Sequence, residues 1–242
     1  SQPEQYPIED VTLSDGIDRT KVIDMLAEGG ESDYRIVYSA AATSAESYAA
    51  TELVTFLGDA TGANLPMVVD SAVEYDPEGR FISVGNTALS ERAGIVADAE
   101  ELNRDGFVVQ TVGSNLYILG ANDRGTIYGV YDFLEKMIGV RFISGDVTYI
   151  PEVETLPLYE TNIKEAPAFE YRNLYSYSMR TDDVLYTRLR FNAPERTITD
   201  MYGGKTDWYT EMSSEVAAKY ENLLALFPTY PTFNVIHNAF YY

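Results

Sequence analysis

The chain has 242 residues, of which 45% are hydrophobic, and a formal net charge of −21 from 38 acidic and 17 basic residues. This hydrophobic fraction can build a buried core, so wholesale disorder is excluded. So acidic a surface repels phosphate groups, which argues against nucleic acid and anionic membrane surfaces as partners. There is no cysteine, so disulfides, thiol nucleophiles and cysteine-ligated zinc are excluded.

No apolar run reaches the ~20 residues that span a bilayer, so we expect no membrane insertion. Residues 1–10 are polar and lack the apolar core of a signal peptide. The protein is therefore either cytosolic or a secreted protein whose signal has been removed. The absence of cysteine fits a secreted bacterial protein.

The first half of the chain predicts alternating helices and strands. Residues 1–14 form a leader, and residues 17–27 have the apolar spacing of a short helix closed by Gly29-Gly30. Thr43 or Ser44 can cap a longer helix that ends at Gly62. Strands are expected at residues 34–38, 65–69 and 81–84, with a turn at 76–79. A short helix should follow up to Ala93, and residues 100–104 should form a polar connection.

Residues 105–142 have the most consistent pattern. Two apolar runs, 107–112 and 116–119, flank Gly113-Ser114, and this arrangement predicts a tight hairpin. Asn122 or Asp123 can cap the helix that follows, and Gly139 stands where a left-handed C-cap belongs. Further strands are expected at 140–142, 147–150 and 156–163. The fold class is therefore α+β, a mixed sheet with helices mainly on one face.

The character of the chain changes after residues 163–167, where proline and polar residues interrupt the apolar periodicity. Residues 170–179 are rich in aromatic side chains, and residues 187–192 predict a short helix or strand. Residues 197–210 predict a loop. A last helix, capped by Ser213 or Ser214, is expected before Pro228.

The sequence resembles a known family in several ordered segments between residues 34 and 180. The run DRGTIYGVYDFLEKMIGVRF, residues 123–142, resembles the end of the small α/β domain that precedes the catalytic barrel in family 20 hexosaminidases. A similar domain opens family 67 α-glucuronidases and several secreted bacterial proteins. YAATELVTFLGDATGANLP, residues 48–66, resembles the first helix of that domain, and FISVGNT, residues 81–87, resembles its central strand.

The resemblance implies three regions: a leader and short helix at 1–33, an accessory α/β domain at 34–165, and the start of a (β/α)₈ barrel at 166–242. A whole barrel needs ~250 residues, whereas residues 166–242 supply about two βα units. We therefore interpret the chain as the front end of a longer secreted or cell-surface carbohydrate-active enzyme, with an incomplete barrel; the alternative is a tail that has been reshaped into a self-contained cap. The remainder of that barrel and a glycan would be its partners.

The segment PAFEYRNLYSYSMR, residues 167–180, resembles the first barrel strand of the hexosaminidases. The resemblance implies that Arg172 and Arg180 contact sugar hydroxyls. Asn173 and Tyr177 depart from the pattern, where glycine and aspartate are expected, which puts the hexosaminidase substrate in doubt. We expect Asp182 or Asp183 to pair with Arg172; the alternative is an arginine that only pairs with a carboxylate at the domain junction.

No residue of the chain is assigned a catalytic role. Glycoside hydrolysis needs two carboxyl groups about 5–10 Å apart, and the acidic pairs Glu100-Glu101 and Asp182-Asp183 are best explained as solvated. His237 is the only histidine; it is either a packed side chain or, by the resemblance, a substrate-facing one. We expect no cofactor and no metal. The Gly120–Asp123 stretch suits a helix cap better than an anion site.

Two functions of different kinds remain. The first is a non-catalytic accessory domain and barrel start of a glycoside hydrolase-like enzyme, which is inactive as the isolated chain. The second is a glycan-binding or structural module without hydrolase activity. A cytosolic small-molecule enzyme has no motif to support it. The 13% of aromatic residues fit either core packing or sugar stacking.

Overall fold

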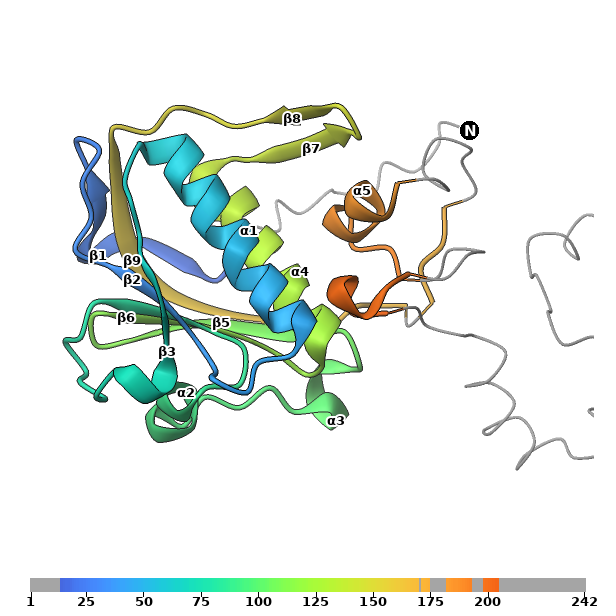
Figure 1. Cartoon of the computed structure of the whole chain (residues 1–242), viewed down its shortest axis with the longest axis horizontal. Coiled ribbons are helices and arrows are strands. Elements are labelled where there is room, and N and C mark those ends of the chain that lie inside the picture. Colours follow the sequence, from blue (N-terminus) through green and yellow to red (C-terminus); the bar gives the residue numbers. More distant parts are fainter. Residues whose placement is uncertain (1–13, 170, 175–181, 193–197, 205–242) are drawn as a thin grey trace, which may run out of the picture.

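The computed structural model describes residues 14–169, 171–174, 182–192 and 198–204 (Figure 1). Its centre is a seven-stranded sheet with the order β1-β9-β5-β6-β4-β2-β3. The strands of this sheet are β1 (Ile17–Glu28), β2 (Arg35–Tyr38), β3 (Met67–Val69), β4 (Phe81–Val84), β5 (Phe107–Val112), β6 (Asn115–Gly120) and β9 (Thr155–Glu165). A separate pair, β7 (Arg141–Ser144) and β8 (Val147–Tyr149), forms a two-stranded antiparallel ribbon.

The sheet is mixed. Strand β2 pairs in parallel with β3 and β4, and β4 pairs in parallel with β6. Strand β5 is antiparallel to both β6 and β9, and β1 is antiparallel to β9. The parallel half carries the crossover helices and the antiparallel half carries the hairpin, as the alternation of elements in the sequence predicted.

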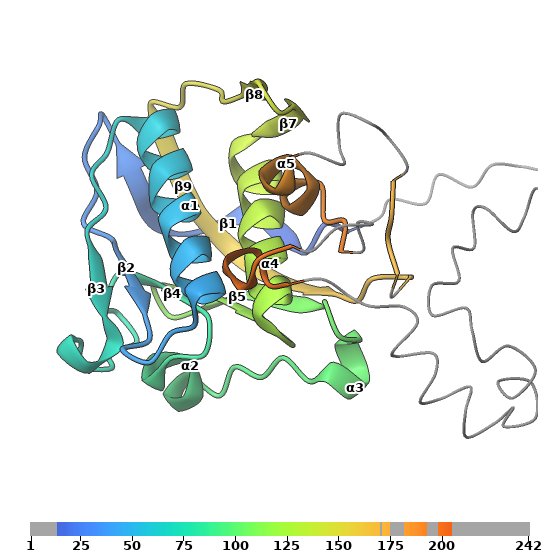
Figure 2. The same ribbon diagram turned by 45° about the vertical axis from the view of Figure 1, so that its right-hand side comes forward.

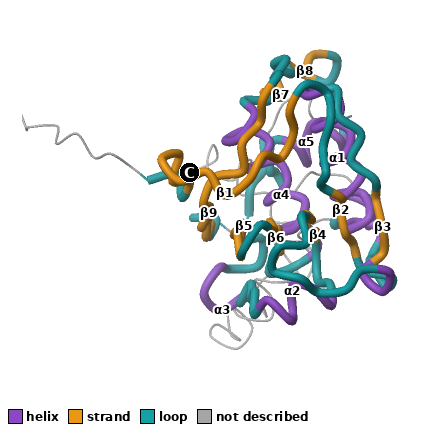
Figure 3. The backbone as a smooth tube through the Cα atoms, turned by 90° about the vertical axis from the view of Figure 1, so that its left-hand side faces the viewer, coloured by secondary structure: helices purple, strands orange, loops and turns teal. Residues whose placement is uncertain are grey.

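Two long helices cover one face of the sheet and two short ones lie on the other (Figures 1 and 3). The helices are α1 (Ser44–Thr61), α2 (Ala88–Ala93), α3 (Ala99–Leu102), α4 (Asp123–Phe133) and α5 (Asp183–Arg188), with 3₁₀ turns η1 (Asp70–Ala72) and η4 (Asp200–Tyr202). Helices α1 and α4 lie side by side on the main core (Figure 2). A smaller core includes Leu89 and Leu102 against Val108 and Tyr117 on the opposite face. The expected α+β fold is confirmed.

The local signals in the sequence produced the expected boundaries. Thr43 caps α1 through a reciprocal capping box with Glu46, and Gly62 ends the helix in the left-handed region. Gly113 has φ +58° in the hairpin between β5 and β6, a conformation that glycine adopts without steric cost. Asn122 caps α4, and the last turn of that helix widens into the π-helical segment η2 (Leu134–Ile138), which Gly139 ends.

Two expected elements were wrong. Residues 17–27 form strand β1 instead of a helix, because this segment finds its hydrogen-bond partners in the edge of β9. The apolar residues of this segment lie too close together for their spacing to distinguish the period of a helix from that of a strand. In the structure Val22 is exposed, whereas Leu26 is buried. Residues 99–102 form helix α3, capped by Asp98, where only a connection was expected. The sheet thus begins before residue 34.

The described residues after β9 pack beside the helices and not in the sheet. Residues 166–169 and 171–174 have no strand assigned, and α5 lies next to α4 (Figure 2). The start of a barrel at residue 166 stays a prediction. None of the helices within the described ranges combines the length and the apolar character that a membrane crossing requires.

Candidate functional site

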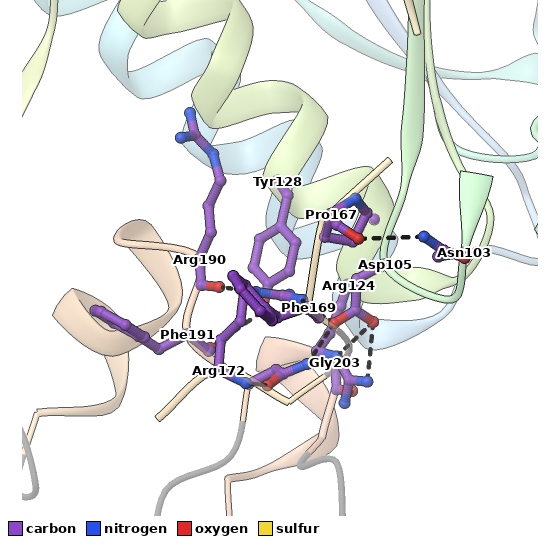
Figure 4. A network of polar contacts seen from close by, with 12 residues as sticks. Asn103, Asp105, Arg124, Tyr128, Pro167, Phe169, Arg172, Arg190, Phe191 and Gly203 are labelled. Atoms are coloured by element: carbon purple, nitrogen blue, oxygen red, sulfur yellow. Dashed lines mark hydrogen bonds and ion pairs between the residues drawn. The ribbon is translucent and has the colours of Figure 1, made fainter. Parts of the chain in front are cut away.

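A buried aspartate lies where the chain enters the central hairpin. Asp105 stands just before β5, and its side chain is only 2% exposed. One carboxylate oxygen, Oδ1, accepts hydrogen bonds from Asn122 Nδ2 at 2.9 Å and from Arg124 Nε and Nη2 at 3.1 and 2.9 Å. The other, Oδ2, accepts from Arg172 Nη2 and Asn192 Nδ2, both at 2.7 Å (Figure 4). Asp105 therefore joins helix α4 to the segment that follows the sheet.

The start of α4 supplies the first set of partners. The Asn122 side chain has two roles, because Oδ1 accepts from the Gly125 backbone N–H as the helix cap while Nδ2 donates to Asp105. Arg124 is 5% exposed and reaches back to Asp105, and its Nη1 also donates to the backbone carbonyls of Gly203 and Gly204. The helix start is thus occupied by its own cap and an ion pair, as the capping interpretation of this stretch predicted.

Arg172 supplies the second set. Its Nε donates to the carbonyl of Arg190, its Nη1 to the carbonyl of Phe169 and its Nη2 to Asp105 (Figure 4). The guanidinium carbon lies 5.6 Å from the centre of the Tyr128 ring, within the range of a cation–π contact. The expected partner, Asp182 or Asp183, was wrong: the carboxylate is Asp105, and Asp182 caps α5 by accepting from the Leu185 N–H.

A second arginine of the same segment pairs with helix α1. Arg188 makes an ion pair with both oxygens of Glu52, with Nε–Oε2 at 3.0 Å and Nη2–Oε1 at 3.2 Å. Its guanidinium carbon lies 5.1 Å from the Phe56 ring centre and 5.3 Å from that of Phe142. The Tyr131 hydroxyl donates to the same Glu52 carboxylate at 2.9 Å. This geometry holds the Glu52 carboxylate in a fixed position between Arg188 and Tyr131.

A third arginine completes the junction. Arg190 pairs with Glu135, and its Nη2 lies 3.5 Å from Asp132 Oδ1. Lys136 pairs with the same aspartate one helical turn away, at 2.8 Å. Arg172, Arg188 and Arg190 thus connect the segment after β9 to acidic side chains on or beside α1 and α4. Arginine suits this arrangement because its planar fork can donate to several oxygens at once.

The environment of Asp105 holds it ionised. Burial by itself raises the pKa of this carboxyl, but the charge of Arg124 and the hydrogen bonds from Asn122, Arg124 and Asn192 outweigh burial, so the pKa lies below its usual value. A general acid for glycoside hydrolysis needs the opposite, a pKa raised toward the working pH. Asp105 is therefore suited to holding arginines and not to donating a proton.

The low pKa of Asp105 predicts a loss of stability in acid. A group whose pKa is lower in the folded state stabilises the fold above its unfolded pKa, here about 3.9, and loses that contribution as pH falls through the lower folded value. We expect the free energy of unfolding to drop below about pH 4, measured by urea denaturation at pH 7 and pH 3. The Asp105→Asn variant should lack this part of the drop. If its free energy of unfolding fell between pH 7 and pH 3 by as much as that of the unchanged protein, the assignment would be contradicted.

A cavity of about 380 Å³ opens beside this network, between α4 and the segment after β9. Its lining comprises Asp105, Phe107, Tyr128, Asp132, Lys136, Glu165, Pro167, Ala168, Phe169, Arg172 and Arg190. Within the described part of the chain, no group of three or more His, Asp or Glu side chains is arranged to hold a metal ion. The cavity is therefore a place where the described residues can receive a small ligand without a metal ion.

The three residues proposed from the resemblance have different outcomes. Arg172 lies in the network around Asp105, and its side chain is 17% exposed. All three of its guanidinium nitrogens donate hydrogen bonds, which favours the alternative of an arginine that pairs with a carboxylate at the domain junction. The contact of Arg172 with sugar stays a prediction. Arg180 and His237 lie outside the described residues. Asp105 and Glu52 were not predicted from the sequence, because no local pattern distinguishes an acid with a distant arginine partner from a solvated one.

Known proteins share parts of this sequence. The model of the glycosyl hydrolase family 67 N-terminus matches residues 27–133. α-Glucuronidase A of Emericella nidulans is 36% identical over 63 residues, which are 26% of this chain and 7% of that protein. The chain therefore spans only a small part of the length of this curated relative.

One solved structure with a TM-score above 0.5 has a similar fold. A family GH115 4-O-methyl-α-glucuronidase with specificity for decorated arabinogalactans aligns over 71% of this chain and 25% of its own, with a TM-score of 0.53 and 19% identity. A mutant Streptomyces plicatus β-hexosaminidase aligns more loosely, over 74% of this chain and 32% of its own, with a TM-score of 0.44 and 11% identity. Residues 27–133 therefore form an N-terminal domain of the glycoside hydrolase type, related to the N-terminus of family 67, as the sequence resemblance predicted.

Proposed function

We propose that this chain is the non-catalytic N-terminal accessory domain, with the beginning of the barrel, of a secreted carbohydrate-active enzyme that cleaves glycosidic bonds. The observation that carries the proposal is the match of residues 27–133 to the family 67 N-terminus. The complete enzyme would act on glycans carrying α-linked glucuronic acid, because the Emericella nidulans relative and the GH115 structure are both α-glucuronidases. The remainder of its own barrel would be the partner of this domain.

The acidic side chains of the described residues support a non-catalytic role. A glycosidase needs one carboxyl group that is protonated at the working pH and another that is ionised, both beside the scissile bond. Three buried acids at the junction with the following segment, Asp105, Glu52 and Asp132, are each paired with arginine. Their chemistry fits the joining of two parts of the protein, which is the task of an accessory domain.

The proposal predicts a division of activity. We expect the 242-residue chain to hydrolyse no member of a panel of aryl glycosides above the buffer rate, since the buried acids at the junction of its described residues are paired with arginine. The longer protein that contains it should release glucuronic acid from α-glucuronosyl-substituted oligosaccharides, measured by chromatography of the products.

Two results would contradict the proposal. One is turnover by the 242-residue chain that disappears when one of its acidic residues is replaced. The other is a longer protein that releases no sugar from glucuronosyl-substituted or other glycans. Secretion is checked separately, by locating the longer protein in culture supernatant and cell fractions.

A further inference from the structure

The cavity beside Asp105 has the size and the position of a small-molecule site. Its volume of about 380 Å³ lies at the lower end of the range of about 300–1,000 Å³ that ligand pockets occupy, so it suits a single small ring. It opens where the segment after β9 crosses α4, and ligand sites often lie at such junctions. Phe107 and Tyr128 are buried at its base. The cavity thus has an apolar floor and a rim formed by the crossing segment.

Two residues of the rim have side chains that make no hydrogen bond, ion pair or ring contact with the described residues. Phe169 lies on the crossing segment with 74% of its surface exposed (Figure 4). Glu165, the last residue of β9, is exposed, and no side chain of the described residues pairs with its carboxylate. An exposed aromatic ring beside an unpaired carboxylate offers a stacking face and a strong hydrogen-bond acceptor.

The charges of the lining select the kind of ligand. Lys136, Arg172 and Arg190 line the cavity together with Asp132, Asp105 and Glu165, so it carries both signs. A free cation would meet three basic groups, and a free anion would meet Glu165 and the field of a chain with net charge −21. A neutral ligand that both donates and accepts hydrogen bonds avoids the repulsion that a cation or an anion would meet. Lys136, whose ammonium is engaged with Asp132 through one contact, can donate to such a ligand.

We propose that this cavity binds one neutral pyranose ring, stacked on Phe169, with its hydroxyls donating to Glu165 and accepting from Lys136. The choice of a sugar among neutral ring polyols rests on the proposed function. The floor and the rim are held in place by the Asp105 network, since Arg172 binds the carbonyl of Phe169 and the Asp105 carboxylate at once.

The test is a binding titration of the 242-residue chain, without any assay of hydrolysis. Methyl β-D-galactopyranoside, methyl α-D-glucopyranoside and methyl β-D-xylopyranoside are the probes, and saturation-transfer NMR is the measurement. We expect at least one to bind, with Phe169→Ala and Glu165→Gln each weakening it about tenfold, which is the scale of one lost stacking or charged contact. Phe169→Tyr should retain binding, because it keeps the ring.

Matched controls separate the site from general effects. Tyr149→Ala removes another exposed aromatic ring and Glu154→Gln another exposed carboxylate, and neither should alter binding. The proposal is overturned if no neutral glycoside binds, if the control variants weaken binding as much as the site variants, or if methylammonium or methyl glucuronide binds in place of the neutral sugars. Equal binding of inositol would overturn the assignment to sugars. Because this experiment measures only binding, a negative result would not bear on whether the longer protein cleaves glycosidic bonds, which is tested separately.

Discussion

Replacing Asp105 with alanine should lower the free energy of unfolding by about 3–5 kcal/mol, the usual cost of removing one partner from a buried ion pair. The loss is large because Arg124, which is 5% exposed, would keep its charge without its carboxylate. Arg172 and Asn192 would lose the same acceptor. Urea denaturation at pH 7, followed by circular dichroism, measures the change.

The control for this experiment is an exposed ion pair in the same part of the fold. Lys164 and Glu101 pair at 3.0 Å with both side chains about half exposed, and such pairs contribute roughly 0–1 kcal/mol. Glu101→Ala should therefore change stability by less than about 1 kcal/mol. If Asp105→Ala behaved like this control, the network around Asp105 would not hold the junction together.

Replacing Leu134 with alanine should cost about 2–5 kcal/mol, because it leaves a cavity in the main core. Leu134 is fully buried where α4 passes into η2. Its carbonyl also accepts the N–H groups of Gly139 and Val140, so the backbone around the new cavity is held and cannot easily collapse into it. The free energy of unfolding in urea is again the measurement.

A matched variant tests whether burial is the cause. Ile143 lies on β7 with 64% of its surface exposed, and substitutions at such positions usually stay within about 0.5 kcal/mol. We expect Ile143→Ala to leave stability nearly unchanged. Equal losses in the two variants would mean that the core assignment of α4 and η2 is mistaken.

The sequence alone determined the elements whose signals are local. The capping box at Thr43, the turn at Gly113 and the cap at Asn122 each rest on residues within a few positions of one another. These signals fix where a helix or a hairpin begins and ends before any long-range contact forms. The hydrophobic face of α4, with Leu134 on it, was readable for the same reason.

Only the tertiary structure decided the features that depend on distant partners. Strand β1 exists because β9, more than a hundred residues later, presents an edge to pair with; the apolar residues of β1 fit a helix equally well when read alone. Arg172 and Asp105 are 67 positions apart and Arg188 and Glu52 are 136 apart. In a chain with 38 acidic residues, nothing local marks which carboxylates will be buried. The ionic junction therefore follows from the packing that removes these few from water, since burial is what makes an arginine partner necessary.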